Sequence, residues 1–246
     1  MTPQMKPLVL VAALSGIFLA QPVIADTIRI ESFTGESGNA TIMFNGTDYH
    51  TGAAASVSES TLTGGFKTYN LTTDPAMTNA FQSWCVDIFR YFSFPATVSG
   101  VMSSAASVFG ATKAVDIGRL YTNQHSLVEG VGSTAINQSA FQLAVWEIVN
   151  EGAAPYDLSM GNFSSTAGST GFGTAQTWLS QLNTTASVSA YDVNIWTNQS
   201  SVQDVVAFSP AVPEPQTYAM VLAGLGLLGF VSRRRRLQKK TRCNAS

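Results

Sequence analysis

The chain of 246 residues contains 15 acidic and 13 basic side chains, and the two kinds are unevenly distributed. Residues 26–212 hold 14 of the acids and five of the bases, which gives this body a net charge of −9. An acidic body repels the phosphate backbone, so the composition excludes a nucleic-acid-binding protein. Its length suits one domain or two small ones.

Residues 1–25 have the pattern of a secretory signal peptide. Lys6 supplies a positive charge, residues 8–20 form an apolar stretch, and Val23-Ile24-Ala25 offers a cleavage site before Asp26. The apolar stretch is too short for a permanent membrane anchor. The sequence therefore predicts an exported protein whose mature domain begins at Asp26.

The body, residues 26–210, predicts a β-rich α+β domain. Short β-branched stretches at 27–30 and 40–44 predict strands, and Asn45-Gly46 predicts the turn of a hairpin. A buried strand is predicted around residues 84–89, and strands return over 188–208.

Two to three helices are predicted in the middle of the body, over residues 104–121, 133–150 and 175–182. The second is the strongest, because Ser133 or Thr134 can cap its first turn and its apolar side chains recur on one face. Gly152 predicts its end. The segment 161–174, rich in Gly, Ser and Thr, predicts a loop.

Most enzyme signatures are missing from the sequence. His50 and His125 are the only histidines and lie in no metal-ligand cluster, and no nucleophile elbow, P-loop or dinucleotide fingerprint is present. We therefore expect no catalytic residues, no metal and no cofactor. An envelope enzyme acting on polysaccharide stays open as the alternative, because a carboxylate pair could come from Asp74, Asp87, Glu147 and Glu151.

Cys85 is the only cysteine of the body, because Cys243 lies beyond the basic cluster near the C-terminus. This excludes an internal disulfide scaffold. Three states remain open for the thiol: a buried free cysteine near an ordinary helix glutamine, a disulfide between two chains, or a bond to another side chain. Gln142 lies on or near the apolar face of the strongest helix, where an amide needs a partner.

Two short motifs around these residues resemble the thioester domains of bacterial surface adhesins. They are Trp84-Cys85-Val86-Asp87 and Phe141-Gln142-Leu143-Ala144-Val145-Trp146. In that family a Cys sulfur and a Gln side-chain carbonyl are joined with loss of ammonia, so the resemblance implies a bond between Cys85 and Gln142. A dry pocket lined by Trp84, Phe141 and Trp146 would slow its hydrolysis, and an amine could attack it.

The C-terminal tail, residues 211–240, has three parts. Pro213, Glu214 and Pro215 keep the chain extended. The uncharged run 218–231 predicts a short membrane-spanning helix. The four arginines that follow would hold its end in the cytoplasm: Arg233, Arg234, Arg235 and Arg236.

This tail resembles the PEP-CTERM sorting signal of exported bacterial proteins. The resemblance implies processing by an exosortase, with anchoring in the inner membrane before delivery to the cell surface or extracellular matrix of a Gram-negative bacterium. We expect an adhesion or exopolysaccharide-associated module, with extracellular polysaccharide or surface amines as further partners. Trp146, Trp178 and Trp196 could stack on sugars, although burial in the core is the commoner use of such side chains.

Overall fold

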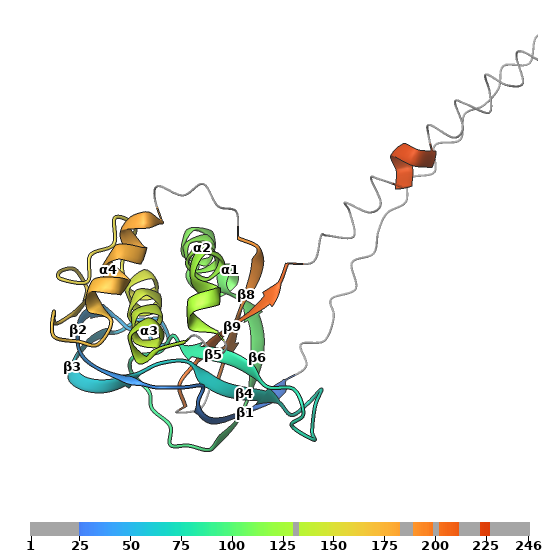
Figure 1. Ribbon diagram of the computed structural model, residues 1–246, viewed down its shortest axis with the longest axis horizontal. Helices are drawn as coiled ribbons and strands as arrows, with labels where there is room; N and C mark the ends of the chain where they lie inside the picture. The colour runs from blue at the N-terminus through green and yellow to red at the C-terminus, as the bar shows by residue number, and fades with distance from the viewer. Residues whose placement is uncertain (1–24, 130–132, 183–188, 199–201, 212–221, 227–246) are drawn as a thin grey trace, which may run out of the picture.

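The computed structural model describes residues 25–129, 133–182, 189–198, 202–211 and 222–226. The fold is β-rich with helices in the middle of the chain, as predicted, and its strands form a closed barrel and a separate sheet. Figure 1 shows the helices gathered on one side of the strands. Strand β1 begins at Asp26, the residue that is predicted to follow the signal peptide.

Six strands form the barrel, in the order β1 (Asp26–Phe33), β4 (Phe66–Asn70), β5 (Phe81–Cys85), β9 (Val205–Pro210), β8 (Tyr191–Thr197) and β6 (Ala96–Ser104). Every neighbouring pair is antiparallel. Closure occurs at β1, where Ile28 lies opposite Asn70 on one side and Val98 on the other. A closed barrel has no edge strand, so most of its backbone groups are paired within the sheet.

The second sheet has the order β3 (Ala54–Thr63), β2 (Gly38–Thr47) and β7 (Phe163–Ser165). The predicted hairpin at Asn45-Gly46 is wrong in position, because both residues lie inside β2 and pair with β3. The turn comes later, where the Asp48 carboxylate accepts from the His50 backbone N–H and from the Thr51 hydroxyl. An Asp that ties down its own turn favours that position over the Asn-Gly pair.

The helices are α1 (Ala105–Phe109), α2 (Ala111–Val128), α3 (Ala135–Asn150) and α4 (Phe172–Gln181). The single helix predicted over 104–121 is divided at Gly110, whose φ of 88° is a left-handed conformation outside helical geometry. Thr134 caps α3 by accepting from the Asn137 N–H, as predicted. The predicted loop at 161–174 contains β7 and the start of α4, because β7 pairs with β2.

Helix α3 packs against both sheets and against α2 and α4. The sequence predicts one apolar face, but residues 138–149 are buried on every side. Polar side chains on this helix are therefore cut off from water and must find partners in the protein. Helix α3 therefore lies between the barrel and the second sheet and contacts both.

Several further predictions are changed or left open by the structure. The strand predicted over 84–89 ends at Cys85. Trp146, Trp178 and Trp196 are buried in the core, the commoner of the two uses considered for them. Within the described residues, none of the helices combines the length and hydrophobicity needed to cross a membrane. The signal peptide, Pro213 to Pro215 and Arg233 to Arg236 lie outside the described residues, and of the predicted span only residues 222–226 are described, as helix.

Candidate functional site

Cys85 is the last residue of β5, and its neighbours determine what reaches it. On one side β5 pairs with β9, where Cys85 lies opposite Val205. On the other side the pairing with β4 ends where Phe66 meets Ser83, so β4 does not reach Cys85. The backbone N–H and C=O of Cys85 are buried there and need partners from elsewhere.

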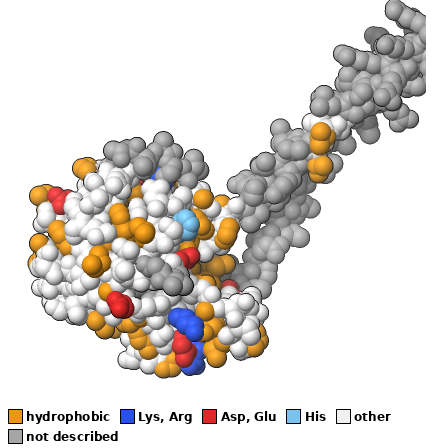
Figure 2. All heavy atoms as spheres, viewed as in Figure 1, with side chains coloured by type: hydrophobic (Ala, Val, Ile, Leu, Met, Phe, Trp, Pro, Cys, Tyr) orange, Lys and Arg blue, Asp and Glu red, His pale blue; other side chains and the backbone are white. Residues whose placement is uncertain are grey.

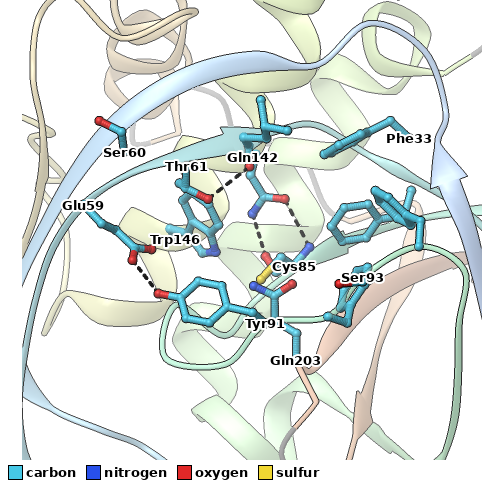
Figure 3. Close-up of a pocket in the computed structure, with 14 residues that line it drawn as sticks. Phe33, Glu59, Ser60, Thr61, Cys85, Tyr91, Ser93, Gln142, Trp146 and Gln203 are labelled. Atoms are coloured by element: carbon cyan, nitrogen blue, oxygen red, sulfur yellow. Dashed lines mark hydrogen bonds between the residues drawn. The ribbon is translucent and has the colours of Figure 1, made fainter.

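The carboxamide of Gln142 supplies both partners. The backbone N–H of Cys85 donates to Gln142 Oε1 at 3.1 Å, and Gln142 Nε2 donates to the backbone C=O of Cys85 at 2.6 Å. A carboxamide carries one acceptor and one donor group side by side, so it replaces a strand neighbour at this point. Figure 3 shows the side chain of Gln142 directed at Cys85, so the two residues of the predicted bond lie together.

The sulfur of Cys85 is buried, with the residue 2% exposed. Its S–H donates to the backbone C=O of Asp87 at 2.8 Å, and the same oxygen accepts from Gln203 Nε2 at 2.9 Å. Burial raises the pKa of the Cys85 thiol well above its usual range, and the nearby charge of Asp87 adds to this effect. The thiol therefore keeps its proton at neutral pH.

A cavity of about 610 Å³ opens onto Cys85 and Gln142 (Figure 3). Part of its wall is aromatic, formed by Phe33, Phe66, Tyr91, Phe92, Phe94 and Trp146. The rest is mainly polar and contains Glu59, Ser60, Thr61, Ser93 and Gln203. A small molecule or a side chain of a partner could thus approach the sulfur and the carboxamide carbon from this side.

Only one of the three predicted pocket aromatics, Trp146, lines this cavity. Trp84 and Phe141 are fully buried elsewhere, with their ring centroids 4.7 Å apart. The physical reason is local geometry: successive side chains of a strand point to opposite faces, and successive positions of a helix are about 100° apart. The direct neighbours of Cys85 and Gln142 therefore cannot face the same space as those two residues.

A polar cluster next to Cys85, built around two buried aspartates, was not predicted from the sequence. His50 Nε2 lies 3.0 Å from Asp87 Oδ2 and 3.5 Å from Asp204 Oδ2, and Arg90 Nη1 lies 3.2 Å from His50 Nδ1. Because Arg nitrogens only donate, Nδ1 accepts from Arg90 and Nε2 carries the proton toward the carboxylates. Tyr49 completes the cluster by donating to Asp204 at 3.3 Å.

This cluster holds the segment that follows Cys85. Burial raises the pKa of both carboxyl groups, of Asp87 and of Asp204, while the nearby His50 and Arg90 act in the opposite direction. The backbone N–H of Val86 donates to the C=O of Asp204, so a main-chain hydrogen bond also joins the segments that carry Asp87 and Asp204. No linear motif predicts the cluster, because its members come from distant parts of the chain.

The other carboxylates considered from the sequence do not meet at the cavity. Asp74, Asp87, Glu147 and Glu151 are all absent from its lining. Among the described residues, no group of three or more His, Cys, Asp or Glu side chains could hold a metal ion. On the face shown in Figure 2, charged side chains are few, and basic and acidic ones lie together near its lower edge.

Comparison with known proteins identifies the sorting motif in the tail. No curated protein matches the chain, and no solved structure matches it either. A family model described as the PEP-CTERM protein-sorting motif matches residues 211–236, which confirms the predicted sorting signal. The chain therefore carries the motif of exported proteins that exosortase sorts to the surface of Gram-negative bacteria.

Proposed function

We propose that the exported body forms an internal thioester between Cys85 Sγ and the side-chain carbonyl carbon of Gln142, and that this bond attaches the protein covalently to amines at the cell surface or in the extracellular polysaccharide. One observation carries the proposal. The carboxamide of Gln142 is held on the backbone of Cys85 at the inner end of a cavity. The arrangement holds an amide carbon beside the residue that bears the buried thiol.

Bond formation is balanced within the two side chains. The sulfur attacks the amide carbon, the C–N bond breaks, and the thiol proton leaves with the nitrogen as ammonia. Negative charge develops on Gln142 Oε1, which already accepts from the Cys85 N–H at 3.1 Å. A backbone N–H aimed at the developing charge stabilises the transition state, as in an oxyanion hole. The contact of Nε2 with the Cys85 C=O orients the departing nitrogen.

The second reaction, attack of an amine on the thioester, takes place from the cavity. An amine that enters attacks the thioester carbon, the C–S bond breaks, and the sulfur takes up a proton. The product is an amide between Gln142 and the incoming molecule, with Cys85 restored as a thiol. Because Cys85 and Gln142 are 2% and 1% exposed, bulk water reaches the bond poorly, which slows hydrolysis before an amine arrives.

The proposal extends to the route by which the protein reaches its target. The run 218–231 would anchor the exported chain in the inner membrane until exosortase cuts near Pro213-Glu214-Pro215. The body would then act in adhesion or in the attachment of extracellular polysaccharide. The envelope-enzyme alternative lacks a comparable observation, because Glu59 is the only carboxylate among the lining residues of the cavity.

The test is the intact mass of the full chain carrying Cys243→Ser, purified after export. We expect a mass about 17 Da below that of the processed sequence, because ammonia has been lost. Cys85 should resist alkylation in denaturant, and methylamine should add to Gln142 while releasing the thiol. Cys85→Ala should abolish both effects. A full mass with a Cys85 that alkylates stoichiometrically would establish the buried free cysteine instead.

A further inference from the structure

Glu59 interrupts an otherwise uncharged row of side chains on β3. Alternate residues of this strand face inward, and the inward row is Ala55, Val57, Glu59, Thr61 and Thr63. Opposite Glu59 on β2 lies Ile42, which is 1% exposed. Turning a carboxylate toward the inner side of a strand costs free energy unless the charge is hydrogen-bonded or paired there, since charged groups prefer water.

The charge of Glu59 faces the cavity that leads to Cys85. Glu59 is the only acidic or basic side chain among the described residues that line it. Its Oε2 accepts from the hydroxyl of Tyr91 at 2.6 Å, and no ion pair to it is found in the described part of the chain. A carboxylate has two oxygens with about four acceptor sites, so most of its capacity is free for a cation.

Tyr91 stays a donor in this pair. Burial raises the pKa of its hydroxyl, and the hydrogen bond to Glu59 raises it further. Tyr91 is nevertheless 55% exposed, whereas Cys85 is 2% exposed, and Figure 3 shows Tyr91 beside Glu59, between it and Cys85. The pair is thus placed where an entering molecule passes before it reaches the sulfur.

We infer that Glu59 is a specificity-determining residue, which selects amines borne by cationic molecules by holding an ammonium group in the cavity while a second amino group reaches the bond. This inference rests on the proposed thioester. The substrate class is a molecule with two or more amino groups, such as a diamine or an amino-sugar polymer. An anionic amine meets the unpaired carboxylate and is disfavoured by like-charge repulsion.

The experiment compares three amines of similar length and different charge: 1,3-diaminopropane, 3-amino-1-propanol and β-alanine. The full chain with Cys243→Ser is treated with each, release of the Cys85 thiol is followed in time, and every rate is divided by that amine's rate with a small thioester in solution. In the reacting form, with the attacking amino group unprotonated, 1,3-diaminopropane is cationic, 3-amino-1-propanol neutral and β-alanine anionic. We expect the normalised rate to fall in that order by roughly tenfold per step at low salt, which lies between the values for one charge pair in bulk water and near a protein surface.

Glu59→Gln should bring the three normalised rates to within about threefold of one another, and Glu59→Lys should reverse their order. Glu36→Gln is the matched control, because Glu36 is an exposed carboxylate outside the cavity lining, and it should leave the order unchanged. Equal normalised rates in the parent chain, or an unchanged order in Glu59→Gln, overturn the role of Glu59 while the thioester stands. A parent chain of full mass that releases no thiol on treatment overturns both proposals.

Discussion

Two glutamines one turn apart on α3 have the same chemistry and different surroundings. Gln138 and Gln142 are each 1% exposed, and each uses its carboxamide to satisfy backbone groups. Gln138 accepts from the Gly65 N–H at 2.9 Å and donates to the Val128 C=O at 2.5 Å. Gln142 binds the N–H and C=O of one residue, Cys85, next to a cavity.

The comparison separates what a buried glutamine needs from what a reactive one needs. Burial and full hydrogen bonding are common to both sites, so neither property marks a reactive group. What distinguishes Gln142 is a sulfur on the residue it binds and a cavity that both residues line. Gln138 is therefore the internal control against which any claim about Gln142 can be measured.

The largest expected difference is in covalent coupling. Gln142→Ala should lose methylamine incorporation completely, because the attacked carbon is gone, whereas Gln138→Ala should keep it. Gln138→Ala should instead lower the free energy of unfolding by about 2–3 kcal/mol, because it leaves buried backbone groups unpaired. Intact mass after methylamine and urea unfolding give the two readouts. Equal loss of coupling in both variants would mean that Gln142 acts only through stability.

The next largest effect concerns Glu147, a carboxyl group that is buried on the same helix as the two glutamines. Glu147 is fully buried, its Oε1 accepts from the Asp157 N–H at 2.8 Å, and its Oε2 finds no partner among the described atoms. Burial raises its pKa from the ordinary 4.5 to about 8. The folded chain thus keeps a proton that the unfolded chain releases above pH 4.5.

The stabilising contribution of protonated Glu147 is complete below pH 4.5 and is lost as the pH rises toward 8. In that window the free energy of unfolding should fall by up to about 1.4 kcal/mol per pH unit. Glu147→Gln removes the titration and keeps an acceptor for Asp157. The variant should therefore be more stable than the parent at pH 9 and similar to it at pH 4. Thermal unfolding of the parent and the variant at pH 4 and pH 9 measures this difference. Stabilities that change with pH in the same way in both proteins would contradict the role of Glu147.

A smaller effect on the free energy of unfolding is expected when a side chain is added at Gly65, which lies next to Gln138. A Cβ on Gly65 would lie 2.8 Å from Gln138 Oε1 and 2.9 Å from Trp84 Nε1. Gly65→Ala should lower the free energy of unfolding by about 2 kcal/mol, because contacts of this kind overpack the core. Gly173→Ala is the control, since nothing lies within 4 Å of its added Cβ, and it should be neutral or slightly stabilising in urea unfolding.

The smallest effect belongs to Tyr91→Phe. Losing one hydrogen bond at a half-exposed site should change the free energy of unfolding by less than about 1 kcal/mol. Covalent coupling should persist, because the hydroxyl contacts Glu59 rather than Gln142. Thiol release with 1,3-diaminopropane measures this. Complete loss of coupling would show that Tyr91 belongs to the reacting centre.

Several elements are predictable from the sequence because their causes are local. Helix α3 ends at Asn150 and is capped by Thr134, as predicted, since a cap is a hydrogen bond between residues three apart. The break at Gly110 is local too. The turn after Asp48 is also local, but the neighbouring Asn45-Gly46 pair is an equally plausible turn signal. Choosing between such signals depends on pairing with distant segments, as when β3 pairs with Asn45-Gly46.

The sequence by itself determined export, the sorting motif and the candidacy of Cys85 and Gln142, because each of these depends on a short run of residues in a fixed order. Only the tertiary structure decided that Glu59 and Tyr91 share a cavity with Cys85, that Trp84 and Phe141 do not, and that His50 lies beside two buried carboxylates. The physical reason is that a cavity and a charge cluster arise where segments far apart in the chain pack together, and their residues follow no common spacing.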